Sequence, residues 1–311
     1  MFESEKIAVG QSPHFQDLKL RIWNFLRIWF FGFGICLLTI GSELANDPPS
    51  VADQRIAFIR EQASKLRVQN AKSQTKYPLH DKLALRWSNP VSGVVDGGVF
   101  VWTDGQRPVV VGKIFINERG STWNEALQSV TSAPAIPFVM QSDNRVVWQP
   151  NGPGIRFLDL DESAGKPSDN ESARLTQMRV IARKIQVIGN WGVPPSDWQL
   201  RILTTPLYRY ASEPDKILDG AIFAYTQGGT NPEGISLIEA VSGDKGEPHW
   251  RIAVTRLTSY GVKATFNDQV IADLPRLTTS PTDAVFFGRS HEFGAYPFPI
   301  TETAKEKGPT K

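Results

Sequence analysis

The chain of 311 residues contains a single cysteine, Cys36, which lies in an apolar segment near the N-terminus. The remaining sequence therefore has no disulfide, no thiol nucleophile and no thiolate ligand for a metal. Its stability must come from a hydrophobic core. Residues 46–311 are numerous enough to build one as one large domain or as two small ones.

The chain also lacks an excess of charge of either sign. The chain has 34 Lys and Arg against 32 Asp and Glu, which leaves a net charge of +2, and no long basic run interrupts the body of the sequence. Binding to phosphate backbones needs clustered cations, so nucleic acid is excluded as the main partner.

Short catalytic signatures are missing as well. The sequence has no His-Glu-x-x-His and no Gly-x-Ser-x-Gly. Besides His249, the sequence offers His80 and His291, each followed directly by an acidic residue. Neighbours in a strand or loop point apart, so adjacency does not make a catalytic dyad. The acidic residues between 159 and 171 lack the spacing of a calcium loop. We expect no cofactor and no metal, and a packing or solvated role for most of these groups.

The N-terminal segment has the organisation of a secretory signal. Ile28–Gly41 is a run of 14 uncharged residues, preceded by Lys19, Arg21 and Arg27 and followed by small and polar residues. It is shorter than the roughly 20 residues of a membrane span. We expect export to the periplasm or cell envelope. A cleaved signal peptide and an uncleaved anchor in the inner membrane both stay open, and this segment would be the only membrane contact.

Two stretches of the chain resemble each other, Val95–Gly105 and Leu218–Gly228. Each reads as a strand entered through Asp-Gly and left through a Gly turn. The second follows the first by 123 residues, and five positions are identical: Asp96 and Asp219, Gly97 and Gly220, Phe100 and Phe223, Thr103 and Thr226, Gly105 and Gly228.

Two further similarities occur in the same order. Trp, Ala, Thr and Ser recur in register in Trp123–Ser132 and Trp250–Ser259, which we interpret as strands. Each meander is preceded by a predicted amphipathic helix. Residues 51–70 would begin with a capping box at Ser50 and Asp53, and residues 171–188 with one at Ser168 and Glu171 and a stop at Gly189. The apolar faces are Ile56, Ile59, Ala63 and Leu66 in the first helix, and Leu175, Met178, Ala182 and Ile185 in the second.

These patterns predict an α+β fold of two tandem repeats, each an amphipathic helix followed by an antiparallel β-meander. Residues 1–45 would be the signal peptide or signal anchor. Residues 46–155 and 156–276 would be the two repeats, and residues 277–311 an irregular strap with a disordered tail.

Asp96 and Asp219 start the twin central strands, and they permit two interpretations. They are weak candidates for paired catalytic carboxylates in a pseudo-symmetric cleft, with His249 as a third candidate. Alternatively, each carboxylate bonds its own backbone in an Asp-Gly turn. The seven tryptophans that follow the N-terminal segment favour a core role over stacking on sugar rings.

Several stretches resemble a group of uncharacterised secreted proteins of planctomycete bacteria: Leu85–Val91, Pro206–Tyr210, Asp219–Tyr225 and Trp250–Ser259. The likeness covers roughly residues 80–275. It implies an extracytoplasmic location, and it carries no known activity that could be transferred to this chain.

The sequence therefore favours a non-catalytic extracytoplasmic protein of the cell envelope with a binding or structural role. An envelope protein or a polysaccharide would be its partner. The alternative is a secreted hydrolase that uses carboxylates or a histidine in a cleft between the repeats.

The first prediction concerns export. Replacing Leu37 and Leu38 with Arg interrupts the apolar run, so we expect the protein to stay in the cytoplasm. Cell fractionation and immunoblotting would measure the distribution. Normal secretion of the variant would contradict the assignment of this segment.

Overall fold

The computed structural model describes residues 49–132, 138–140, 145–190, 197–243, 247–277, 285–288 and 295–300. These residues belong to one compact unit, Pro49–Lys311. Among the described residues, no helix has the length and apolar character needed to cross a membrane. The predicted signal segment and the predicted disordered tail lie outside the described residues.

The described part consists mainly of strands. Its helices are α1 (Val51–Lys65) and α2 (Glu171–Lys184), with two short 3₁₀ turns at Pro90–Ser92 and Glu162–Ala164. The strands before α2 are β1 (Leu66–Gln69), β2 (Lys76–Tyr77), β3 (Leu85–Asn89), β4 (Val94–Asp104), β5 (Arg107–Asn117), β6 (Thr122–Ser129), β7 (Phe138–Met140), β8 (Val146–Trp148) and β9 (Leu158–Asp159). Those after α2 are β10 (Ile185–Asn190), β11 (Asp197–Ser212), β12 (Ile217–Thr226), β13 (Pro232–Ser242), β14 (Pro248–Arg256), β15 (Gly261–Phe266), β16 (Gln269–Leu274) and β17 (Val285–Gly288).

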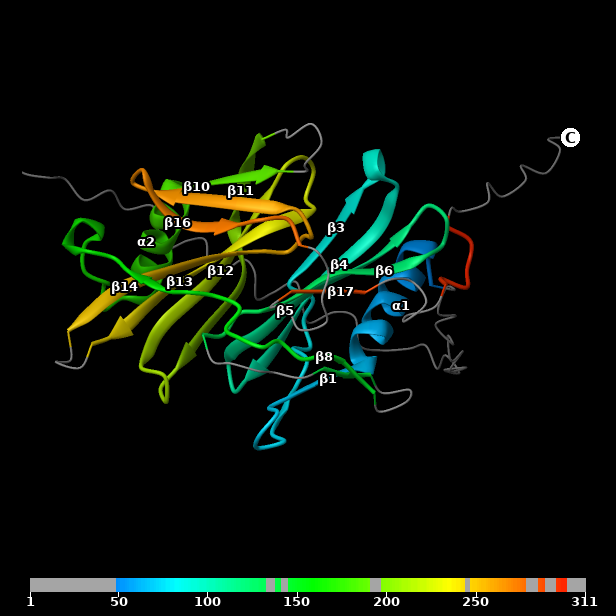
Figure 1. Ribbon diagram of the computed structural model, residues 1–311, viewed down its shortest axis with the longest axis horizontal. Helices are drawn as coiled ribbons and strands as arrows, with labels where there is room; N and C mark the ends of the chain where they lie inside the picture. Colours follow the sequence, from blue (N-terminus) through cyan, green and yellow to red (C-terminus); the bar gives the residue numbers. More distant parts are fainter. Residues whose placement is uncertain are drawn as a thin grey trace, which may run out of the picture. The chain divides into compact units, whose positions relative to one another are not determined.

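The strands form three sheets in which every pair is antiparallel, so the predicted α+β class is confirmed (Figure 1). The first sheet has the order β17-β6-β5-β4-β3, and the second has the order β16-β15-β10-β11-β12-β13-β14-β9. A four-stranded sheet has the order β2-β1-β7-β8. Both β4 and β12 are interior strands, as predicted. The predicted strap contains β17, which pairs with β6 and extends the first sheet.

Both helices are shorter than the sequence predicts. Each passes directly into a strand, at Leu66 and at Ile185, where the backbone is already extended. These two residues are nevertheless buried, because a strand that leaves a helix at this point still directs its first side chain into the same core. The predicted stop at Gly189 is therefore wrong, since this glycine lies inside β10.

The first helix begins as predicted, with the Ser50 hydroxyl accepting from the Asp53 amide. For the second helix the predicted capping box is wrong. Asn170 is the N-cap, and its side chain accepts from the Ala173 amide. Ser168 instead accepts from the Asn170 amide and positions the cap. Asn is as good an N-cap as Ser, so the position next to the first helical residue decides between them.

Three hydrophobic clusters lie between successive layers. The first joins α1 to one face of the first sheet, through residues such as Ile59, Phe100 and Trp102. The second lies between the opposite face of the first sheet and the second sheet. The third joins the second sheet to α2. The two sheets therefore lie back to back, with one helix on each outer side (Figure 1).

Charged side chains are buried between the two sheets. The ammonium group of Lys113 is fully buried and donates to Asn231 Oδ1 at 2.8 Å and to the Pro232 carbonyl at 2.6 Å. Glu239 accepts from the Tyr210 hydroxyl and from Arg251 Nε, both at 2.6 Å. Burial and the neighbouring carboxylate raise the pKa of Tyr210 well above its usual value. These bonds satisfy polar groups that would otherwise be costly in the interior.

The register of strand pairing decides which of the residues that match in the sequence occupy corresponding positions in the two sheets. Phe100 and Phe223 are both buried, at 3% and 0% exposure, on the faces that meet α1 and α2. The match between Trp123 and Trp250 in the sequence does not extend to their surroundings. Trp250 is buried opposite Ala240, whereas Trp123 is only half-buried and lies opposite Phe115. A bulge in β6 adds one residue to the strand, and a shift of one residue turns a side chain to the other face.

The second prediction concerns Gly97 and Gly220, where a side chain has no room. A Cβ at Gly97 would lie 2.5 Å from Cε2 of Trp87, and one at Gly220 would lie 2.6 Å from Cε2 of Tyr210. Gly97→Val and Gly220→Val should each destabilise the protein by about 1–3 kcal/mol through overpacking, measured by denaturant unfolding.

Gly152 provides the matched control, because a Cβ at this position would have no atom within 4 Å. Gly152→Val should change the free energy of unfolding by less than about 0.5 kcal/mol. Equal effects at all three glycines would contradict the packing explanation.

Candidate functional site

Asp96 is held by two arginines from different elements. It lies on β4 at 3% exposure, on the face that packs against α1. Arg86 of β3 donates from Nε to Oδ1 at 3.0 Å and from Nη2 to Oδ2 at 2.5 Å. Arg55 of α1 donates from Nε to Oδ2 at 3.3 Å. The Arg86 guanidinium also donates to the Ala52 carbonyl in the first turn of α1. The carboxylate therefore ties the helix to the sheet.

Asp219 has the same set of partners on the other side of the molecule. Arg209 of β11 donates from Nε to Oδ1 at 2.9 Å and from Nη2 to Oδ2 at 2.6 Å, and Arg174 of α2 donates to Oδ2 at 3.0 Å. The Arg209 guanidinium also donates to the Glu171 carbonyl at the start of α2. Hydrogen bonding to the aspartates raises the pKa of Arg86 and Arg209, so both stay charged.

We call each of these clusters an arginine clamp: Asp96 with Arg55 and Arg86, and Asp219 with Arg174 and Arg209. The four arginines were not among the predicted site residues. Their positions could have revealed them, because Arg209 follows Arg86 by 123 residues, the same interval that separates Asp219 from Asp96.

The clamps exclude both sequence interpretations of the aspartates. Neither carboxylate bonds its own backbone in a turn, because both lie within strands. They also do not share a cleft, since Asp96 faces α1, Asp219 faces α2 and both sheets lie between them. Both oxygens of each carboxylate accept hydrogen bonds from arginines, which hold them away from any shared substrate.

His249, the third candidate, lies on β14 beside a pocket of about 440 Å³. Its Nε2 is 3.4 Å from Oδ1 of Asp159 on β9, and its side chain is 38% exposed. Lys166 and Glu247 also line the pocket and pair with each other at 3.0 Å, although both are 74% exposed. His249 is thus close to both solvent and a carboxylate, but neither Asp96 nor Asp219 lines this pocket.

The other sequence candidates have ordinary surroundings where the structure describes them. The His80 ring makes an edge contact with Tyr208 at 5.0 Å, and His291 lies outside the described residues. Asp161 accepts from the Ser163 amide and caps a 3₁₀ turn. Within the described residues, no three His, Cys, Asp or Glu side chains come together in a way that could hold a metal ion.

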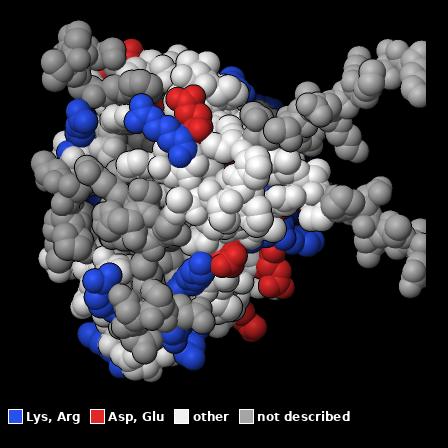
Figure 2. Space-filling view, turned by 90° about the vertical axis from the view of Figure 1, so that its right-hand side faces the viewer, with Lys and Arg blue, Asp and Glu red and all other residues white. Residues whose placement is uncertain are grey.

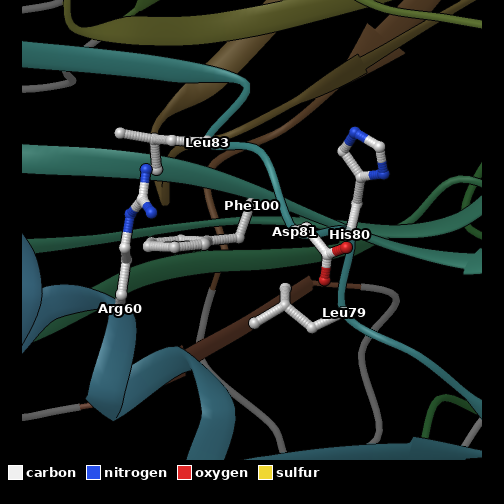
Figure 3. Close-up of a pocket in the computed structure, with 6 residues that line it drawn as sticks. All are labelled: Arg60, Leu79, His80, Asp81, Leu83 and Phe100. Atoms are coloured by element: carbon white, nitrogen blue, oxygen red, sulfur yellow. The ribbon is translucent and has the colours of Figure 1, made fainter.

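A small pocket beside α1 combines charge with an apolar surface. It has a volume of about 190 Å³ and is lined by Arg60, Leu79, His80, Asp81, Leu83 and Phe100. Figure 3 shows the Phe100 ring between Arg60 on one side and Asp81 on the other, with Leu79 and Leu83 flanking it and the His80 ring directed away. No sequence pattern pointed to this pocket.

Both signs of charge occur on the surface that Figure 2 shows. On the side shown in Figure 2, basic side chains are spread across the surface, and acidic side chains lie beside several of them. A wider, open groove of about 680 Å³ crosses β10, β15 and β16 and mixes both signs of charge, including Lys263, Asp273 and Arg276. These surfaces offer no focused field for a highly charged partner.

Comparisons with family models, curated proteins and solved structures found no match to the chain. Its function must therefore be inferred from its own residues.

The third prediction concerns the arginine clamps. Asp96→Asn and Asp219→Asn each leave two arginines without their shared carboxylate. We expect each variant to lose about 3 kcal/mol of stability, near the lower end of the range for a broken buried ion pair, because the arginines are partly exposed.

Thermal and denaturant unfolding of the two variants would measure these losses. Asp169→Asn is the matched control at an exposed position and should lie within about 0.5 kcal/mol of the unmodified protein. A loss at Asp96 or Asp219 no larger than the control would show that the clamp does not hold the helix to the sheet.

Proposed function

We propose that the chain is a tandem duplication that acts without catalysis outside the cytoplasm, as a binding or structural protein of the cell envelope. The N-terminal repeat would comprise α1 with β1–β8, and the C-terminal repeat α2 with β10–β16. Residues 46–155 and 156–276, as expected from the sequence, contain these elements.

Strand pairing supports the duplication. The order β3-β4-β5-β6 corresponds to β11-β12-β13-β14, and the order β1-β7-β8 corresponds to β10-β15-β16. Individual residue pairs correspond as well. The pair Val68 and Tyr77 corresponds to the pair Val187 and Leu200. The pair Leu79 and Trp102 corresponds to the pair Ile202 and Tyr225. A chance sequence similarity within one strand would not be expected to produce the same residue pairing across several strands.

The two arginine clamps are the observation that carries the non-catalytic proposal. The strongest catalytic candidates are the twin aspartates, and both act as attachment points between helix and sheet. A hydrolase would then have to rely on His249 and Asp159, whose separation of 3.4 Å is at the long end of a hydrogen bond. The geometry therefore favours the binding or structural role over the hydrolase.

The N-terminal apolar run, with Lys19, Arg21 and Arg27 before it, supports the proposed extracytoplasmic location. Because Cys36 is the only thiol, a cysteine introduced elsewhere can report its compartment without background once Cys36 is replaced by Ser. Val91 is 100% exposed and suits this purpose.

The fourth prediction uses that position. In cells whose outer layer admits small reagents, Val91→Cys should react with a membrane-impermeant maleimide without lysis. Mass spectrometry or a gel shift would measure labelling. Ala63→Cys, at 0% exposure, is the control and should stay unlabelled before and after lysis. Labelling of Val91→Cys only after lysis would place the protein in the cytoplasm and refute the proposal.

A further inference from the structure

The pocket in Figure 3 lies where the strand that precedes β4 bulges away from it. Leu79 pairs with Trp102 and Leu85 pairs with Val99, so residues 80–84 lie opposite only two residues of β4. The second sheet has the same irregularity. Leu203 pairs with Ala224 and Tyr208 with Ile222, which leaves residues 204–207 opposite Phe223. A bulge of this kind leaves backbone groups without a ladder partner.

In the second sheet, an arginine from the helix covers the bulge. Arg179 of α2 donates from Nε to the Thr204 carbonyl at 3.3 Å. The corresponding residue of α1 is Arg60, since it precedes Arg179 by the same 119 residues that separate Arg55 from Arg174. Arg60 makes no hydrogen bond and no ion pair with any residue that the structure describes, and its side chain is exposed. Its guanidinium is therefore available at the edge of the pocket.

The remaining walls define what would complete the site. Leu79 and Leu83 are partly buried and present carbon surface beside the Phe100 ring, which is itself only 3% exposed, and this surface suits an apolar skeleton (Figure 3). The guanidinium of Arg60 offers paired donors that match a carboxylate. Asp81 at the opposite side repels a second negative charge. At roughly 30 Å³ for each water, the volume of about 190 Å³ holds about six water-sized groups, which is too small for a nucleotide or an oligosaccharide.

We propose that this pocket binds a small organic monocarboxylate, with its carboxylate on Arg60 and its carbon skeleton on Leu79 and Leu83. The proposal specifies a ligand class for the binding role proposed above. It uses the correspondence between the two bulges, but the pocket would bind its ligand whatever the origin of the repeat.

The fifth prediction is tested by calorimetric titration of the full chain with benzoate, hexanoate, succinate and inorganic phosphate. Benzoate or hexanoate should bind saturably, and succinate and phosphate at least about tenfold more weakly. Arg60→Gln should lower the affinity for the monocarboxylate at least about tenfold, as expected for the loss of a charged hydrogen bond. Asp81→Asn should strengthen the binding of succinate relative to benzoate.

Arg179→Gln is the matched control, because it removes the corresponding arginine where no pocket is proposed, and it should leave the affinity unchanged. Equal losses in Arg60→Gln and Arg179→Gln would show that the helix arginines act through the fold, which overturns the site. The absence of saturable binding of either monocarboxylate up to about 10 mM would also overturn it. Neither result bears on maleimide labelling at Val91, so failure of the pocket and failure of the envelope location are distinguishable.

Discussion

The attachment of each helix to its sheet through one buried carboxylate is the interaction on which the rest of the structure depends. Asp219 receives hydrogen bonds from an arginine on the neighbouring strand and an arginine on the helix, and the strand arginine reaches on to a helix carbonyl. One charged group thereby fixes the position of α2 over the sheet, in addition to the apolar packing of the helix. An apolar contact could supply similar stability, but it would fix the rotation of the helix less strictly, because dispersion is not directional.

The same device appears at Asp96, and its consequence is a layered molecule. Since each clamp occupies an outer face, the inner faces of both sheets are left to pack on each other. The buried Lys113 and Glu239 lie in that inner region and are fully supplied with partners. Charges in this protein are thus used mainly to hold layers in place, and the interior between the sheets is closed by apolar side chains.

This use of charge limits where function can lie. The two aspartates that the sequence singles out are engaged in the fold, and the proposed pocket lies where the two larger sheets differ. The edge of the bulge beside Phe100 is that place. Arg179 donates a hydrogen bond to a carbonyl of its bulge, whereas Arg60 lines a pocket at the corresponding position. A difference at such a position is physically reasonable, since a bulge can carry different side chains without disturbing a ladder of hydrogen bonds.

The sequence alone determined the secondary structure that local patterns encode. Alternation and Gly turns located β4 and β12, and Ser50 located the start of α1, because these depend on neighbouring residues. The helices were predicted too long at their C-terminal ends. Leu66 and Ile185 each continue the apolar spacing of the helix before them, although each is the first residue of a strand.

Only the tertiary structure decided the direction and the partners of the side chains. The bulge in β6 turned Trp123 away from the position that its twin Trp250 occupies, and no local pattern marks one extra residue in a strand. Asp96 and Asp219 were weak catalytic candidates in the sequence. The structure shows that each accepts hydrogen bonds from an arginine of a helix and an arginine of a neighbouring strand. Those contacts join residues as much as 45 positions apart in the chain, and the chain must fold before such groups meet.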